Sequence, residues 1–126
     1  MTLKFAYVFA AFVGGLGVAL GAFGTHGLRG NMEPHLMEAY QTAVQYQLIH
    51  ALALIGVALT IVLLGPKPSF VISAYSFLVG IILFSGSLYV LALTDMTSLG
   101  LVTPLGGLCL IVGWLSLIIG GLRHIG

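Results

Sequence analysis

The chain has 126 residues, of which 60% are hydrophobic and only 6% are charged, and its net charge is +1. A soluble domain carries about 25% charged residues, so this composition excludes a protein with a water-exposed surface and predicts one that is solvated by lipid. The charge balance excludes a nucleic-acid partner, because no basic patch is available to neutralise phosphates. Cys109 is the single cysteine, which excludes an internal disulfide and a cysteine-rich metal site.

Four apolar segments follow one another along the chain, at about residues 5–23, 48–64, 70–93 and 99–122. Each is close to or above the length of about 17–25 residues that a membrane-spanning helix needs. The first segment is longer than the apolar core of a signal peptide, about 7–15 residues, so we expect it to be a retained helix. The sequence therefore predicts an all-α membrane protein, a four-transmembrane-helix bundle that forms a single transmembrane domain over residues 1–126.

The connections between these segments differ in length. Gly65–Ser69 and Thr94–Ser98 are short polar links, and short links make neighbouring helices antiparallel. The connection before the second segment is longer, but no helix breaker lies between Pro34 and Leu64. Because proline suits the first turn of a helix, the second helix should be extended at its N-terminal end, to about 31 residues and roughly 46 Å.

The basic residues predict how the chain is oriented. With four antiparallel spans, one side of the membrane holds Lys4, Lys67 and Arg123, whereas the other side holds Arg29 alone. Basic residues in short loops favour the cytoplasmic side. We therefore expect both termini to lie in the cytoplasm.

Small residues recur along the apolar segments at helical spacing. In the fourth segment Gly106, Gly113 and Gly120 are seven residues apart, so they share one helix face. Such stripes let helix backbones approach closely. They favour packing within one chain, and a homo-oligomer interface is the alternative. The predicted helix-packing residues are Gly17, Gly21, Gly80, Ser87, Gly106, Gly113 and Gly120.

Polar side chains crowd the start of the second apolar segment, in the stretch Thr42–His50. On a helical wheel Gln45, Tyr46 and His50 share a face, and Gln47 points elsewhere. Antiparallel pairing brings polar residues of the other helices to the same non-cytoplasmic end. Hydrocarbon penalises unpaired polar groups, so the cluster predicts either a ligand or ion site or interhelical hydrogen bonds of about 0.6–2 kcal/mol each. The candidate ligand-binding residues are His26, Gln45, Tyr46, His50, Tyr89 and Thr103.

Specific chemistries find little support in the sequence. It has no nucleophile elbow, phosphate-binding glycine loop or paired intramembrane carboxylates. His26 and His50 could ligate haem but lack any further pattern, and a zinc site would lack nearby third and fourth ligands. We therefore expect no cofactor, no metal and no catalytic residue. The expected partners are the lipid bilayer and either a second copy of the chain or a larger membrane complex.

Four motifs resemble a known family, and together they extend over most of the chain: Gly21–Leu28, Thr42–Ala53, Leu83–Tyr89 and Thr103–Gly107. They resemble the domain of unknown function 423 family of small bacterial inner-membrane proteins, whose relatives include the animal transmembrane protein 256. The resemblance implies a multi-pass protein of the inner membrane with four helices, and it assigns no activity. The stripes of small residues, the small size and the missing catalytic residues favour a non-enzymatic structural, interaction or accessory protein. The alternative is a protein that binds or conducts a small molecule, lipid or ion.

Overall fold

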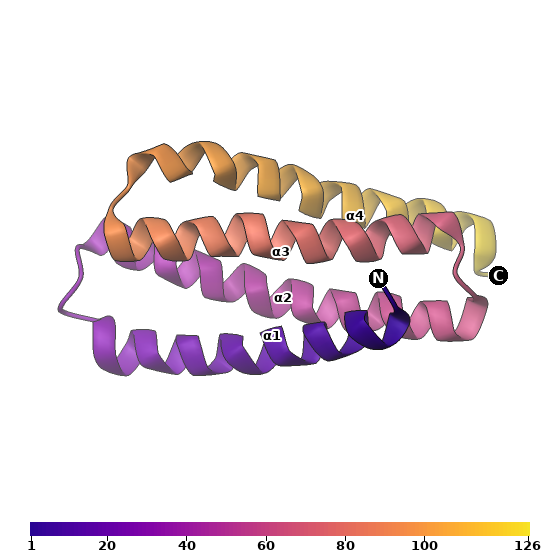
Figure 1. Cartoon of the computed structure of the whole chain (residues 1–126), viewed down its shortest axis with the longest axis horizontal. Coiled ribbons are helices and arrows are strands. Elements are labelled where there is room, and N and C mark those ends of the chain that lie inside the picture. The colour runs from indigo at the N-terminus through magenta and orange to yellow at the C-terminus, as the bar shows by residue number, and fades with distance from the viewer.

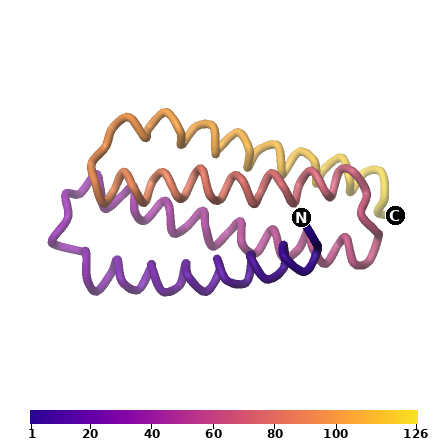
Figure 2. Tube along the Cα trace, viewed as in Figure 1, coloured from indigo at the N-terminus to yellow at the C-terminus, as the bar shows by residue number.

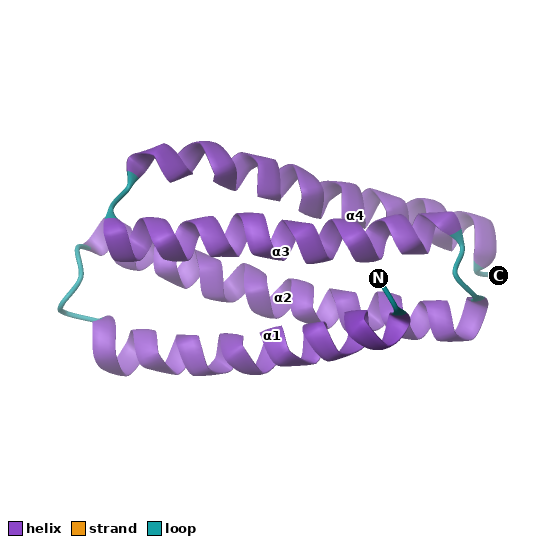
Figure 3. Ribbon diagram, viewed as in Figure 1, coloured by secondary structure: helices purple, strands orange, loops and turns teal.

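The computed structural model describes residues 1–126 and contains helices and loops but no strand (Figure 3). The four long helices are α1 (Leu3–Phe23), α2 (Pro34–Leu64), α3 (Pro68–Thr94) and α4 (Val102–His124). Each is long and apolar enough to cross a membrane. The predicted all-α fold with four membrane-spanning helices is confirmed.

The connections place consecutive helices antiparallel, as Figure 1 shows. α1 continues into a π-helical turn, Gly24–Leu28, and a 3-10 turn, Thr97–Leu101, precedes α4. These two connections lie at one end of the molecule, and the α2–α3 turn lies at the other end (Figure 2). Both termini lie toward the end that holds the α2–α3 turn.

The second helix is extended as the sequence predicts. α2 has 31 residues and begins with Pro34 in its first turn. Proline has no backbone N–H, and the first turn is where a helix does not need one. The helix ends at Leu64 and is capped by Gly65, which has a φ of 89°, a conformation that glycine adopts at little cost.

The bundle is open, because its first and last helices do not meet. α1 packs on α2, α2 on α3 and α3 on α4, whereas α1 and α4 make no contact. In Figure 1, α1 and α4 form the two outer edges, and α2 lies behind the plane of α1 and α3. The edge helices therefore keep a larger share of their surface free of protein contacts.

Large side chains of one helix pack against glycines of the next. The rings of Phe77 and Phe70 in α3 lie against Gly113 and Gly120 in α4. In the opposite direction, Leu110 of α4 packs against Gly80 of α3. Phe70, Phe77 and Leu110 belong to the main apolar core. Between α1 and α2, Leu48 packs against Gly17 and Val44 packs against Gly21.

Gly106 marks the closest approach of α3 and α4. A Cβ atom there would lie 2.7 Å from the Cα atom of Phe84 and 2.8 Å from the carbonyl carbon of Leu83. Both atoms belong to the backbone, so relief would require the helices to move apart. At Gly107 the nearest atom to a Cβ would be in the Phe84 ring, at an ordinary contact distance of 3.7 Å.

These two neighbouring glycines give a matched test of helix packing. Gly106→Ala should lower the free energy of unfolding by about 1–3 kcal/mol, because overpacking forces the backbones apart. Gly107→Ala should leave stability unchanged or raise it by up to about 1 kcal/mol, because alanine is the better helix former. Thermal unfolding of both variants in detergent would measure the difference, and equal effects would contradict this packing.

Candidate functional site

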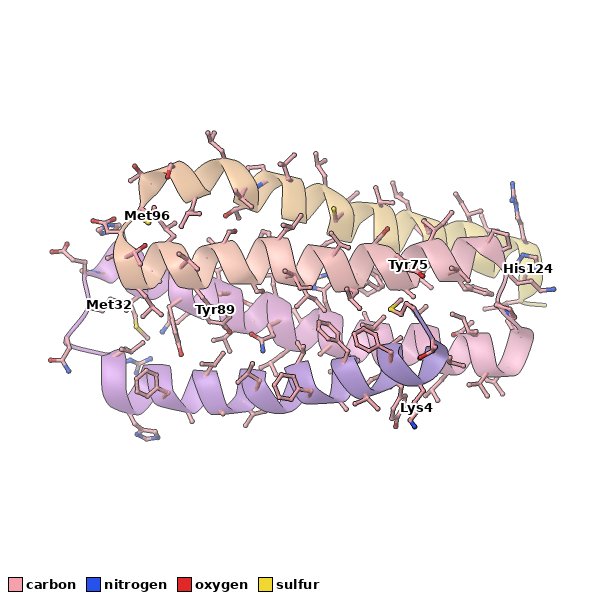
Figure 4. All side chains as sticks on the ribbon, viewed as in Figure 1. Lys4, Met32, Tyr75, Tyr89, Met96 and His124 are labelled. Carbon is pink, nitrogen blue, oxygen red and sulfur yellow. The ribbon has the colours of Figure 1, made fainter.

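The amide of Gln47 joins three helices. Its side chain is only 3% exposed. Its Nε2 donates a hydrogen bond to the carbonyl oxygen of Val13 in α1, at 2.8 Å. Its Oε1 accepts one from the hydroxyl of Tyr89 in α3, at 2.5 Å. Figure 4 shows Tyr89 reaching out from α3 toward α1. One side chain of α2 thus connects α1 and α3, which otherwise have few contacts with each other.

Two further hydrogen bonds extend this connection along α2. The hydroxyl of Tyr40 donates to the carbonyl oxygen of Leu20 at 2.5 Å, and the hydroxyl of Ser85 donates to that of Ala43 at 2.8 Å. The rings of Tyr40 and Tyr89 meet edge to face, with centroids 5.4 Å apart. Tyr40 and Ser85 are both buried. A hydroxyl without a partner is unfavourable in an apolar environment, and the interhelical hydrogen bond supplies that partner.

His50 uses both ring nitrogens within the protein. The indole Nε1 of Trp114 lies 3.0 Å from His50 Nε2, and the carbonyl oxygen of Tyr46 lies 2.8 Å from His50 Nδ1. Because an indole N–H can only donate, Nε2 must accept. Nδ1 then carries the hydrogen and donates to the carbonyl. These bonds define a neutral imidazole that links α2 to α4 and has no nitrogen free for a metal or haem.

α3 and α4 are joined by hydroxyl groups. Ser73 donates to the carbonyl oxygen of Gly113 at 2.9 Å. Ser87 and Thr103 share a hydrogen bond of 2.6 Å between their hydroxyls. Together with the bonds of Gln47 and His50, these contacts give every pair of sequential helices at least one side-chain hydrogen bond.

The predicted ligand-binding residues do not converge on one pocket. His50, Tyr89 and Thr103 take part in the interhelical bonds described above. Tyr46 is 38% exposed and packs its ring on Phe84, with centroids 4.6 Å apart.

The remaining two predicted residues lie apart from that network. Gln45 is exposed and lines a groove of about 350 Å³ between α1 and α2, which also contains Thr25 and Gln41. His26 is exposed on the π-helical turn.

The polar network extends from the middle of the helices toward one end of the bundle. Val13 is at the midpoint of α1, and His50 and Trp114 lie near the midpoints of α2 and α4. The bond between Ser87 and Thr103 lies at the start of α4, the end at which the sequence predicts the cluster. Within the polar stretch of α2, Gln47 and His50 are buried against other helices, whereas Gln45 and Tyr46 are exposed.

Gln47 is the residue that sequence reasoning missed. The usable signal was its spacing from Ala43, Ala51 and Leu54, which places it on the buried face of α2 among small residues. A glutamine at such a position needs partners on neighbouring helices. Trp114 offered no comparable signal, because its contact with His50 depends on the rotation of α4.

The charged residues lie outside this network. His35 is 3.9 Å from both Glu33 and Asp95 at the end of the molecule, and all three side chains are well exposed. Contacts this long between exposed side chains add little to stability. No three His, Cys, Asp or Glu side chains come close enough together to hold a metal ion.

Known proteins resemble this chain in sequence along most of its length. Residues 20–107 match the family described as Protein of unknown function (DUF423). The chain belongs to the DUF423 family. The matched region includes the π-helical turn, all of α2 and α3, and the start of α4. The resemblance found in the sequence motifs is confirmed.

Relatives cover nearly the full length of this DUF423 chain. It is 41% identical to the UPF0382 inner membrane protein YgdD of Escherichia coli, over 98% of the chain and 93% of YgdD. It is 40% identical to the UPF0382 membrane protein SH2409 of Staphylococcus haemolyticus, over 98% of the chain and 100% of that protein. The UPF0382 membrane protein YwdK of Bacillus subtilis is 39% identical, over 87% of the chain and 89% of YwdK. No solved structure matches the chain. This DUF423 chain is therefore a multi-pass membrane protein of a family without an assigned activity.

Two nearby glutamines test whether the network stabilises the fold. Gln47→Leu should lower the free energy of unfolding by about 1–3 kcal/mol, because the Val13 carbonyl and the Tyr89 hydroxyl lose their partner. Gln45→Leu should change it by no more than about 0.5 kcal/mol, because Gln45 is exposed. Thermal unfolding of both variants in lipid nanodiscs measures the two changes in stability. A larger loss for Gln45→Leu than for Gln47→Leu would show that the hydrogen bonds of Gln47 do not stabilise the helix packing.

Proposed function

We propose that this DUF423 protein acts without catalysis, by associating within the membrane with a second copy or with other membrane proteins. The observation that carries the proposal is the open bundle, in which α1 and α4 make no contact with each other. Only 22% of the most apolar stretch of α1 or α4 is buried, against 33% for α2 and 39% for α3. The edge helices thus offer the largest faces for a neighbouring protein.

The use of the polar groups supports the same proposal. Gln47, Ser73, Ser85 and His50 are buried and form hydrogen bonds between helices. Side chains committed in this way stabilise the helix arrangement, and they would have to break those bonds to act on a substrate. A binding function that uses His26, Gln45, Tyr46, His50, Tyr89 and Thr103 is the second candidate. It has less support, because His50, Tyr89 and Thr103 already have partners.

We further propose that the protein lies in the inner membrane with both termini in the cytoplasm. A relative with 41% identity is named an inner membrane protein. The end of the molecule that holds the α2–α3 turn and both termini also carries Lys4, Lys67 and Arg123, and this excess of basic residues supports a cytoplasmic location.

One fluorescent fusion tests both association and orientation. A green fluorescent protein at the C-terminus should fluoresce in bacterial cells, because it folds and matures only on the cytoplasmic side. Single-cysteine variants would be made in a Cys109→Ser background at outward positions of α1 (Val18→Cys, 65% exposed) and α4 (Ile118→Cys, 58% exposed). Cross-linking in native membranes should shift the fluorescent band of at least one of them to a higher mass.

Ile72→Cys provides the matched control, because this outward position of α3 is 50% exposed but lies on a central helix. It should cross-link less than the edge positions. A band that stays monomeric for both edge variants would overturn the proposed association, and dark cells with inserted protein would overturn the orientation.

A further inference from the structure

A cleft lies between α1 and α3, with α2 as its floor. Its volume is about 310 Å³, at the lower end of the range for small-molecule sites, about 300–1,000 Å³. Beyond one end of the cleft, the amino group of Met1, which precedes α1, lies 2.7 Å from the hydroxyl of Tyr75 in α3. The cleft is lined by Phe9, Phe12, Val13 and Leu16 of α1, Gln47 of α2, and Ile81, Ile82, Ser85, Gly86 and Tyr89 of α3.

The cleft lies near the middle of helices α1 and α3. Val13 is the midpoint of α1 and Ile81 is the midpoint of α3, and the two side chains pack together with Ala51 in a small apolar cluster. At the rim, Phe12 is 65% exposed and Ile82 is 52% exposed. An occupant would therefore enter sideways from the hydrocarbon of the bilayer.

One buried amide, that of Gln47, lies at the floor of this apolar cleft. Gln47 has two amide hydrogens, of which one is donated to the carbonyl oxygen of Val13. The second has no acceptor among the protein's hydrogen bonds, although Gln47 is only 3% exposed. An amide hydrogen without an acceptor is costly in hydrocarbon. A carbonyl oxygen of a bound molecule would pair with it, and the Tyr89 hydroxyl holds the amide in place from its other side.

The walls restrict what the occupant can be. No charged side chain lines the cleft, so an ionised head would be left without a counter-charge in a medium of low dielectric constant. Phe9 and Phe12 on α1 and Tyr89 on α3 present aromatic rings. Aromatic side chains pack favourably on another flat ring in stacked or edge-to-face geometry. Gly86 contributes no side chain, which leaves room beside Tyr89.

We propose that this cleft binds an uncharged, lipid-soluble molecule whose head is a flat ring that carries a carbonyl group, which is the chemistry of a quinone. The ring lies between the aromatic walls, its carbonyl oxygen accepts the second hydrogen of Gln47, and its apolar tail leaves past Phe12 into the bilayer. This binding does not require association through the edge helices. The cleft lies between α1 and α3 with α2 beneath it, and no residue of α4 lines it.

Thermal unfolding of the full chain in nanodiscs tests the proposal with three probes. A benzoquinone with a decyl tail should raise the unfolding temperature in a concentration-dependent manner. Dioctanoylglycerol, which has ester carbonyls but no ring, and decanol, which has a hydroxyl but no carbonyl, should raise it less at equal concentration. No shift with the quinone, or an equal or larger shift with either of the other probes, would overturn the proposal.

Two glycines make the test specific to the cleft. A Cβ atom at Gly86 or at Gly56 would meet no protein atom within 4 Å, so both Gly86→Leu and Gly56→Leu should fold. Only Gly86 lines the cleft. Gly86→Leu should therefore weaken quinone binding by about tenfold or more, the effect of losing about 1.4 kcal/mol, whereas Gly56→Leu should leave it unchanged.

A second pair of variants covers the case in which Gly86→Leu fails to fold. Phe12→Leu removes a ring from the rim of the cleft and should weaken quinone binding. Phe23→Leu removes a ring of α1 that is 55% exposed, against 65% for Phe12, and that lies outside the cleft, so it should not. Quinone binding that survives both Gly86→Leu and Phe12→Leu would show that the molecule binds elsewhere.

Discussion

The arrangement of the helices depends on one amide buried near the middle of the bundle. Gln47 accepts a hydrogen bond from Tyr89 of α3 and donates one to the backbone of Val13 in α1. Lipid supplies no hydrophobic force that drives two helices together, so packing and hydrogen bonds must do so. Since α1 and α3 touch each other little, an interaction that engages both fixes their positions relative to α2.

The other contacts follow from the same constraint. Between α1 and α2 and between α3 and α4, a glycine receives a large side chain or, at Gly106, the backbone of the next helix. The contact of α2 with α3 has no such glycine, and the hydrogen bonds of Gln47 and Ser85 join these two helices. Most buried polar side chains reach a partner on another helix, as His50 reaches Trp114. These contacts join sequential helices. α1 and α4 make no contact, and the open bundle that results leaves both the edge helices and the cleft beside Gln47 accessible from the lipid.

Most of the fold could be predicted from the sequence, because it follows from local properties. Apolar segment length determines the number of spans, short links determine antiparallel order, and Pro34 with the unbroken run to Leu64 determines the length of α2. The polar contacts were harder to predict. A helical wheel correctly separates Gln45 from Gln47, but which of the two faces is buried depends on where α1 and α3 pack. The contact between His50 and Trp114 depends on the rotation of α4, which no local pattern encodes.

A double-mutant cycle between Gln47 and Tyr89 measures the central interaction most directly. Gln47→Leu, Tyr89→Phe and the double variant would be compared with the unchanged protein by their free energies of unfolding in nanodiscs. A direct hydrogen bond predicts a coupling energy of about 0.6–1.7 kcal/mol, the range found for interhelical bonds in membranes. Additive effects, with a coupling below about 0.3 kcal/mol, would contradict the role of Gln47 as the link between α2 and α3.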